Sequence, residues 1–419
     1  MAASPPSLAL LLPQRLPPEG FAFVQRLTEE AKAAKAPVYL VGGVVRDLFL
    51  DRPVLDVDFA VEGDAHALAR RLAERLRGRA VTHDQFGTAT VHLDGRSFDL
   101  AMTRTERYAH PGDLPTVSPG SLRDDLNRRD FTINAMAVSL NEGSFGQVID
   151  PLDGRDDLKG GKIRILHDDS FVDDPTRSYR ACRYAARFDF AIEKRTFKLL
   201  VEGTKLVPAI SGDRLRHEVE RTLQEAEPEK AFDLLRETWA LQSIHYGLRW
   251  DEKLFRWFER SRKMGLAASN VYLALLVLRL KPETVESVAE RLNLTAAQAA
   301  AMRDGRRLWN AVAPFEDAAM RSSRVVALLS EYSADAIAAC RVATQVPIIE
   351  THLRRYQDEL RHVQPELNGD DVLSLGVPRG PGVGRVLRAL RDARLDGEAA
   401  SRDAEVALVR RWLERGLPS

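Results

Sequence analysis

Two carboxylates separated by one apolar residue, Asp56 and Asp58, lie in the run Pro53–Val61. Side chains alternate faces along a strand, so both acids would project from one side while Val57 and Phe59 point into the core. Like charges this close repel unless cations lie between them, and two divalent ions about 3.5–4 Å apart commonly catalyse in-line phosphoryl transfer. The spacing predicts metal-dependent chemistry on a phosphate. The alternative is a solvated acidic strand end.

Upstream, the run Val38–Asp47 indicates a buried strand, a turn at Gly42 and Gly43, and the first turn of a helix. Because glycine has no side chain, backbone N–H groups at a helix start can approach an anion closely. We expect this turn to bind a triphosphate. Arg46 would either contact phosphate or pair with Asp47.

A third acid, Asp99, lies in the run Arg96–Met102, which is predicted to form a strand. If this strand neighbours the one that carries Asp56 and Asp58, Asp99 could complete the metal site or accept the proton of an attacking hydroxyl. An acid on the surface of an edge strand is the alternative.

The run Arg128–Asn134 begins with two adjacent arginines and Asp130. Guanidinium groups suit phosphate or sugar oxygens, and the acid could accept a hydrogen bond from a ribose hydroxyl. Asn134 ends this candidate nucleotide-binding segment. A solvated charge cluster is the alternative. The preceding segment, 103–127, is rich in Pro, Gly and charge and is predicted to be a long flexible loop.

A helix start is predicted at Asp173–Arg183, with Asp174 and Arg177 three residues apart on one face and Arg180 continuing the stripe. A carboxylate beside a guanidinium complements the amino group and ring nitrogen shared by cytosine and adenine. Uracil and guanine present an oxygen and an N–H at these positions, so the same pair does not match them. We expect this pair to select C and A without a nucleic-acid template. A helix cap with surface salt bridges is the alternative.

The elements that position these residues form two regions. A mixed sheet with helices is predicted up to about residue 150, and nearly continuous helical periodicity follows Pro151, which gives an α+β fold. The expected helices of the first region are 20–35 and 64–77, and its expected strands are 37–42, 55–61, 79–83, 87–93, 97–102 and 133–140.

Composition limits the protein class. The chain has 419 residues, 44% hydrophobic and 29% charged, and a net charge of zero, so several globular domains and only local nucleic-acid contacts are expected. Cys182 and Cys340 are too few for a disulfide framework, which fits a reducing cytoplasm.

Leu8–Leu12 is expected to be a docked N-terminal segment. The run Val271–Leu278 is too short to span a bilayer, so no membrane association is expected.

Five runs together closely resemble the motifs of the class II tRNA nucleotidyltransferase and bacterial poly(A) polymerase family. In chain order they are Gly42–Asp47, Asp56–Asp58, Arg128–Thr132, Asp173–Arg177 and Ser211–Arg216. Beyond them, Leu367–Val377 and Gly380–Gly382 are similar to the tail of the tRNA enzymes. The family commonly has Glu where Asp173 stands.

The resemblance implies a polymerase β-like head at 1–150, a helical neck at 151–230, a body at 231–345 and a tail at 346–419. It also implies two Mg²⁺ ions held by Asp56 and Asp58, ATP and/or CTP as substrates, and the tRNA acceptor and T arms as partner, with no protein partner. Ribose contacts would come from Arg129 and Asp130. Base selection would come from Asp174 with Arg177.

Three alternatives stay open from the sequence alone. The basic signature of poly(A) polymerases is not found in residues 80–90, which favours tRNA over poly(A) addition. The length of 103–127 disfavours CC addition and leaves CCA addition and A addition alone. A non-catalytic RNA-binding module is the rival from another class, and it is disfavoured by the intact Asp56 and Asp58.

Two further runs are possible binding or catalytic sites, and only the first is interpreted as functional. The segment Gly376–Gly384, with Arg379, Arg385 and Arg388 nearby, offers N–H groups and positive charge to an RNA backbone. His167-Asp168 resembles half of a phosphohydrolase signature, but it lacks a partner at the matching spacing and is interpreted as a chance dipeptide.

Overall fold

The computed structural model describes residues 7–54 and 56–418, and the side chain of Gln85 is also left out. The chain divides into two compact units, Met1–Ile244 and His245–Ser419.

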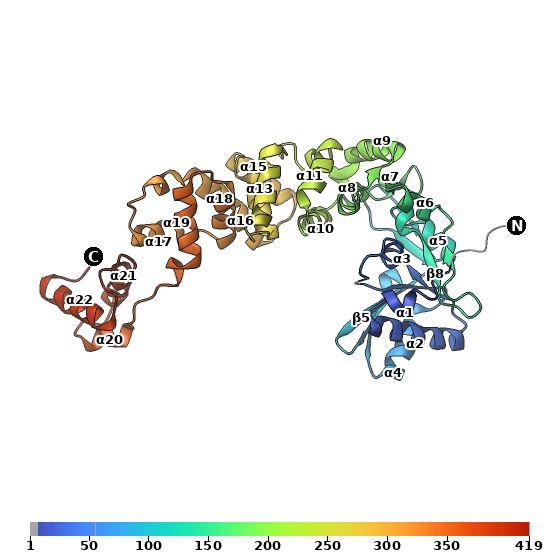
Figure 1. Ribbon diagram of the computed structural model, residues 1–419, viewed down its shortest axis with the longest axis horizontal. Coiled ribbons are helices and arrows are strands. Elements are labelled where there is room, and N and C mark those ends of the chain that lie inside the picture. Colours follow the sequence, from blue (N-terminus) through green and yellow to red (C-terminus); the bar gives the residue numbers. More distant parts are fainter. Residues whose placement is uncertain (1–6, 55, 419) are drawn as a thin grey trace. The chain divides into compact units, whose positions relative to one another are not determined.

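The first unit contains a seven-stranded mixed sheet in the order β3-β4-β5-β2-β1-β8-β9 (Figure 1). Its strands are β1 (Val38–Val41), β2 (Asp58–Val61), β3 (Arg79–His83), β4 (Thr88–Leu93), β5 (Arg96–Met102), β8 (Ala137–Ser139) and β9 (Val148–Ile149). β2 and β5 are parallel neighbours, and the other neighbouring strands pair antiparallel. The predicted α+β class is confirmed.

Helix α2 (Pro18–Ala34) covers one face of this sheet together with α4 (Ala65–Leu76). The ring of Phe23 stacks on Phe98 at 4.0 Å and lies 5.5 Å from Phe59. Helix α5 (Leu122–Asn127) covers part of the other face, where Leu122 and Leu126 join a buried cluster with Ala60. Because residues two apart share a face, Asp58 lies on the face of Ala60, opposite Phe59.

The sequence anticipated these elements closely, with three differences. Segment 103–127 contains regular structure where one long loop was expected: it forms a hairpin of β6 (Arg104–Arg107) and β7 (Thr116–Pro119), followed by α5. A capping box between Ser121 and Asp124 starts α5. Second, the expected strand 133–140 begins with a short 3₁₀ turn, Thr132–Asn134, and only Ala137–Ser139 pairs in the sheet.

The third difference concerns 173–183. Helix α7 (Ser170–Asp173) ends before Asp174, and α8 (Arg177–Phe188) begins after Pro175, whose ring is incompatible with a continuous helix. Asp174 therefore lies in the link between two helices rather than on the same helix as Arg177. Of the expected strand 55–61, Leu55 lies outside the described residues and Asp56 precedes the first paired residue, Asp58.

The rest of the first unit is helical apart from the short parallel pair β10 (Lys162–Ile163) and β11 (Ala191–Ile192). Besides α7 and α8, it contains α6 (Gly154–Lys159), α9 (Lys194–Gly203), α10 (Gly212–Leu223), α11 (Pro228–Glu237) and α12 (Ala240–Ile244). The N-terminal segment is docked as expected: Leu8 and Leu12, the first residue of α1 (Leu12–Arg15), are buried, and the N–H of Leu8 donates to the carbonyl of Gly146.

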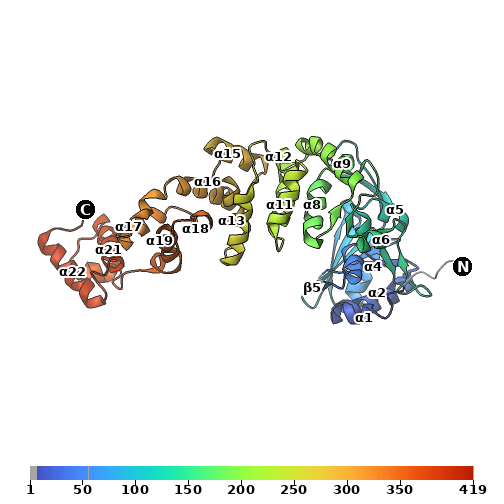
Figure 2. The same ribbon diagram turned by 45° about the horizontal axis from the view of Figure 1, so that its top comes forward.

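The second unit is all helical in its described residues. Its helices are α13 (Glu252–Lys263), α14 (Ser269–Val277), α15 (Pro282–Arg291), α16 (Ala296–Asn310), α17 (Ser322–Leu329), α18 (Ala334–Ala343), α19 (Pro347–Asp358), α20 (Gly369–Ser374), α21 (Pro381–Leu395) and α22 (Arg402–Arg415). Helices α14, α16 and α18 pack on one another, and α20, α21 and α22 lie together in both views (Figure 2). Throughout the described chain, every helix is too short or too polar to cross a membrane.

Candidate active site

The three candidate carboxylates lie close together. In the parallel ladder of β2 and β5, Asp58 is the register partner of Asp99, and both side chains are exposed on one face of the sheet. Asp56 is also exposed, whereas Val57 between the two acids is buried. The hydroxyl of Thr90 donates to Asp99 Oδ1 at 2.6 Å and thereby orients this carboxylate. The expected alternation of exposed acids and buried apolar residues is present.

The charge of this cluster is not balanced by protein alone. The Asp58 carboxylate is accessible to solvent but lies at the cavity, where surrounding protein partly desolvates it and raises its pKa. The positive charge of Arg129 lowers this pKa, and the charges of Asp99 and Asp56 raise it. Within the described residues, no three His, Cys, Asp or Glu side chains form a complete metal cage. Mg²⁺ usually binds through one or two carboxylates together with waters and substrate phosphates. The cluster fits an ion whose coordination is completed by a substrate.

Asp58 opens into a cavity of about 570 Å³ within the first unit. The predicted site residues that line it are Gly42, Gly43, Arg46, Asp58, Arg128, Arg129, Asp130, Asn134, Asp174, Arg177 and Arg180. Asp99 is not among the lining residues, and Asp56 lines a separate, smaller hollow with Arg96. These predicted residues come from four of the five motifs, and Arg214 of the fifth motif, Ser211–Arg216, also lines the cavity.

Gly42 is required by its conformation and by its neighbour. Its φ of +76° is unfavourable for other residues, and a Cβ there would lie 2.6 Å from Arg129 Nη1. Arg129 is held from its other side by Asp125, whose Oδ2 accepts from Arg129 Nη2 at 2.9 Å. These contacts keep a cationic group beside the turn that starts α3 (Gly43–Phe49).

Arg46 is buried and forms the predicted pair with Asp47. Its Nη1 also donates to Asn134 Oδ1 at 2.7 Å, and its guanidinium lies over the rings of Phe188 and Tyr184 at 4.6 and 5.4 Å. Arg46 thus joins the glycine turn to α8. The prediction that it contacts phosphate stays a prediction.

Asp130 is fully engaged by the protein. Its Oδ1 accepts from the Phe131 N–H and from Asn134 Nδ2, and its Oδ2 accepts from Nε and Nη2 of Arg180. Burial raises the pKa of Asp130, but the charge of Arg180 and the hydrogen bonds from Asn134 and Arg180 outweigh it and hold the pKa at about 2. A ribose hydroxyl would have to replace one of these four donors, so the predicted ribose contact stays a prediction.

The predicted base-reading residues have different partners from those expected. Asp174 does not pair with Arg177: its Oδ1 accepts from the N–H and hydroxyl of Thr176 and from Arg214 Nη2 at 2.7 Å. No hydrogen bond from a described residue reaches its Oδ2. Arg177 donates from Nη1 to Ser170 and from Nη2 to the carbonyl of Arg128. Both side chains line the cavity and retain unused polar atoms.

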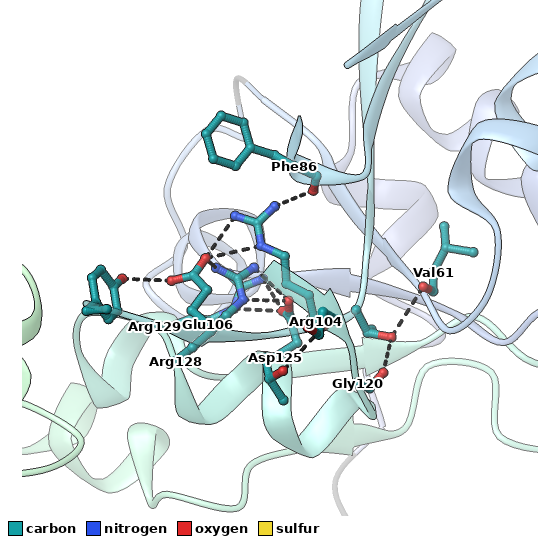
Figure 3. Close-up of polar contacts among 12 residues, drawn as sticks. Val61, Phe86, Arg104, Glu106, Gly120, Asp125, Arg128 and Arg129 are labelled. Carbon is teal, nitrogen blue, oxygen red and sulfur yellow. Dashed lines mark hydrogen bonds and ion pairs between the residues drawn. The ribbon is translucent and has the colours of Figure 1, made fainter. Parts of the chain in front are cut away.

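Glu106, on the β6–β7 hairpin, organises the cavity wall next to them. Its Oε1 accepts from Nε and Nη2 of Arg104 and from Arg128 Nη1 at 2.9 Å, and its Oε2 accepts from the hydroxyl of Tyr108 at 2.8 Å. Figure 3 shows the carboxylate of Glu106 between the side chains of Arg104 and Arg128. Arg128 also pairs with Asp125, so one network joins the hairpin to α5.

Several cavity residues were not predicted. They are Glu106, Tyr108, Thr176, Tyr184, Arg214, His217, Glu218 and Arg221. Glu106 and Tyr108 belong to the segment that was expected to be a loop, so no element placed them. Arg214 lies in the motif Ser211–Arg216, which was the available signal. Tyr184 lies one turn beyond Arg180 on α8.

The arginines predicted to contact RNA lie in the second unit, around the start of α21. Arg385 donates to the carbonyl of Pro418, and no hydrogen bond or ion pair with a described residue is found for Arg379 or Arg388. The guanidinium groups of Arg385 and Arg388 lie beside Gly382 and Gly384, 3.8 and 3.9 Å from where a Cβ would stand. Their positive charges are available to an anion.

Two family models match the chain. The model described as "Poly A polymerase head domain" matches residues 38–164, and "Probable RNA and SrmB- binding site of polymerase A" matches residues 189–248.

Similar proteins and structures extend this match over nearly the whole chain. An A-adding tRNA nucleotidyltransferase from Geobacter sulfurreducens is 34% identical over 95% of this chain and 48% of its own, and a CC-adding tRNA nucleotidyltransferase from Deinococcus radiodurans is 31% identical over 95% of each. The chain spans about half the length, or less, of the A-adding relatives that it matches.

Two solved structures are similar across the full length. "The structure of CCA-adding enzyme apo form II" has a TM-score of 0.83 at 31% identity and covers 96% of this chain and 98% of that one. "Thermotoga maritima CCA-adding enzyme complexed with tRNA_CCA" has a TM-score of 0.78 at 29% identity, with 97% and 99% covered.

Proposed function

Because this chain belongs to the class II tRNA nucleotidyltransferase family, we propose that it transfers a nucleoside monophosphate from ATP or CTP to the 3′ end of tRNA and releases pyrophosphate. The observation that carries the proposal is the cavity of the first unit, which joins a catalytic carboxylate, Asp58, to the base-reading candidates Asp174 and Arg177. A site for transfer alone would not need the second pair.

Asp56 and Asp58 are the proposed ligands of two Mg²⁺ ions, with Asp99 beside them. The raised pKa of Asp58 supports this role, because a neighbouring cation would relieve the repulsion among the three acids. Mg²⁺ bound there would neutralise charge on the α-phosphate and lower the pKa of the attacking 3′-hydroxyl. Arg129 Nη1, beside Gly42, is positioned to contact the triphosphate.

Asp174 and Arg177 are the proposed readers of the base. Arg214 and Thr176 occupy Oδ1 of Asp174, which leaves Oδ2 to accept from the amino group of adenine or cytosine. Arg177 keeps donors for the ring nitrogen. Uracil and guanine would place an oxygen against the carboxylate and an N–H against the guanidinium. The same proposal includes the four-part division into head, neck, body and tail and a cytoplasmic location. It also includes tRNA contacts from Arg379, Arg385 and Arg388.

The experiment that tests this function offers each labelled triphosphate with three tRNAs: one that lacks CCA, one that lacks only the terminal A, and one that is complete. Incorporation of AMP only into tRNA that lacks the terminal A identifies A addition, which the A-adding relatives favour. Incorporation of CMP followed by AMP identifies CCA addition. An unstructured RNA serves as the control for poly(A) synthesis, and a long A tail on it would overturn the tRNA proposal.

Base selection has its own test. Asp174→Ala or Arg177→Ala should reduce discrimination against UTP and GTP by about tenfold or more, since each removes a hydrogen-bonding partner of the base. The matched control is Asp168→Ala, at an exposed Asp that pairs with Arg195 outside the cavity. Unchanged discrimination in both cavity variants would reject this assignment.

A further inference from the structure

Two aromatic side chains, Tyr108 and Tyr184, are found among the described residues that line the cavity. A nucleobase bound against Asp174 and Arg177 presents two flat faces, and stacking on an aromatic ring is a common way to hold such a face. Hydrogen bonds at the base edge do not supply this contact. The two tyrosines differ in whether a face is available.

The ring of Tyr184 is already surrounded by protein. The guanidiniums of Arg46, Arg180, Arg183 and Arg187 lie 5.0–5.6 Å from its centroid. Phe131 meets it edge-on at 5.9 Å, and Phe188 is stacked at 6.0 Å. Tyr184 therefore packs against the arginines around α8, and these contacts already surround its ring.

Tyr108 is placed differently. It directly follows β6, and it lines both the main cavity and an adjoining one of about 240 Å³. Its hydroxyl is fixed by Glu106, and no aromatic or cationic neighbour occupies its ring among the described residues. Burial and the charge of Glu106 raise the pKa of Tyr108, and the charges of Arg177 and Asp174 also act on it. Tyr108 is thus close to both candidate base-reading residues.

We infer that Tyr108 forms the wall on which the base of the incoming nucleotide stacks, with Glu106 holding the ring by its hydroxyl. This assignment rests on the proposed function, because it requires a nucleoside triphosphate in the cavity. Stacking is tolerant of base identity, so Tyr108 contributes affinity while Asp174 and Arg177 contribute selection. The larger purine ring of ATP gains more from the contact than the pyrimidine ring of CTP.

The test compares Tyr108→Leu, Tyr108→Phe and the matched control Tyr246→Leu, which removes an exposed tyrosine ring in the second unit. The Kd of ATP is measured by calorimetry without tRNA, and the KM of ATP and CTP is measured with a tRNA acceptor. Tyr108→Leu should raise the Kd and KM of ATP about tenfold or more, with a smaller change for CTP. Tyr108→Phe, which keeps the ring, and Tyr246→Leu should each stay within about threefold of the wild-type protein.

Inorganic tripolyphosphate, which has no base, separates stacking from a general structural effect. Its inhibition constant should be the same in the wild-type protein and in Tyr108→Leu. The preference for CTP over UTP, whose bases are both pyrimidines, should also be unchanged. Equal weakening of tripolyphosphate and ATP, or an unchanged Kd for ATP in Tyr108→Leu, overturns the inference. A wild-type protein that binds ATP but adds nothing to tRNA overturns the proposed function and leaves the Kd comparison valid.

Discussion

At the scale of single residues, the carboxylate cluster combines its proposed catalytic role with a cost in stability. Asp58 has a raised pKa, and its ionised form lies beside Asp99 and Asp56. A carboxyl group whose folded pKa is raised stabilises the fold below its ordinary pKa and loses that contribution as pH rises through the raised value. At neutral pH, ionised Asp58 therefore opposes folding until a cation is bound.

Asp58→Asn should lower nucleotide incorporation about 100-fold or more while slightly raising the melting temperature of the metal-free protein at pH 7. Thermal melts with and without Mg²⁺ and ATP check this. The combination of Mg²⁺ and ATP should stabilise the wild-type protein and have little effect on the variant. Asp94→Asn, at an exposed turn with φ +48°, is the matched control. A variant with normal turnover would contradict the metal-binding role.

Asp130 behaves in the opposite way. Its pKa of about 2 lies below the ordinary 3.8, so its ionised form stabilises the fold above pH 4, and this contribution is lost as pH falls from about 4 to 2. Asp130→Asn should reduce the free energy of unfolding at pH 7 by about 2–3 kcal/mol, and the difference should shrink toward pH 2. Urea unfolding at several pH values measures it.

Asp168→Asn is the control for this prediction, because Asp168 pairs with Arg195 on the surface. Exposed ion pairs contribute about 0–1 kcal/mol, so the control should be nearly neutral. Equal losses in the two variants would show that the buried network around Arg180 has no special importance.

At the scale of elements, the β6–β7 hairpin is ordered by one carboxylate. Glu106 accepts from Arg104, Arg128 and Tyr108, and its side chain is only 7% exposed. Glu106→Gln keeps the shape but removes the counter-charge of Arg104, whereas Arg128 keeps its pair with Asp125. Breaking a buried pair in this way typically costs about 3–5 kcal/mol.

We expect Glu106→Gln to speed amide hydrogen exchange in residues 104–119 by at least about tenfold and to raise the KM for ATP. The sheet strands β1 and β2 should exchange at the rate of the wild-type protein. Glu142→Gln, which removes an exposed pair with Lys32, should leave exchange in the hairpin unchanged. Unaltered protection of 104–119 in Glu106→Gln would contradict the role given to Glu106.

The same hairpin marks where sequence reasoning is limited. The strands and the carboxylate triplet were predictable because the alternation of apolar and polar residues and the spacing of the acids are local properties of the sequence. The candidates Gly42, Arg129 and Asp130 likewise each came from one short run of residues. The Pro, Gly and charge content of 103–127 indicated a loop, because its order depends on partners elsewhere, such as the carbonyl of Phe86 for Arg104. The pairing of Asp174 with Arg214, 40 residues away, was likewise invisible locally.

At the scale of the whole molecule, the proposed nucleotide site and the candidate RNA contacts lie in different units. The net charge of the chain is zero, so binding of tRNA must depend on local arginines. No salt bridge with a described residue is found for Arg379 or Arg388, although Asp392 lies within electrostatic reach of Arg388, and Arg385 donates to the carbonyl of Pro418. Each such side chain that contacts a phosphate releases counter-ions on binding.

Replacing Arg379, Arg385 and Arg388 with Ala should weaken tRNA binding and lower the slope of log K against log salt by about 0.7–0.9 for each phosphate that is no longer neutralised. The Kd of ATP should not change, since the cavity lies in the first unit. Arg303→Ala, which removes an arginine already paired with Glu286, is the matched control. An unchanged slope in the triple variant would exclude these arginines from RNA binding.

The parallel register of β2 and β5 has a consequence for how such chains diverge. The turn at Asp94 and Gly95 can accept insertions or deletions, because it lies beyond the paired residues of β4 and β5. A single added or deleted residue between Gly95 and Asp99 would shift the frame of the strand and bring Phe98 or Leu100 opposite Asp58 in place of the acid. Descendants of a common ancestor should therefore vary in length at the turn and keep a gapless alignment from there to the third acid.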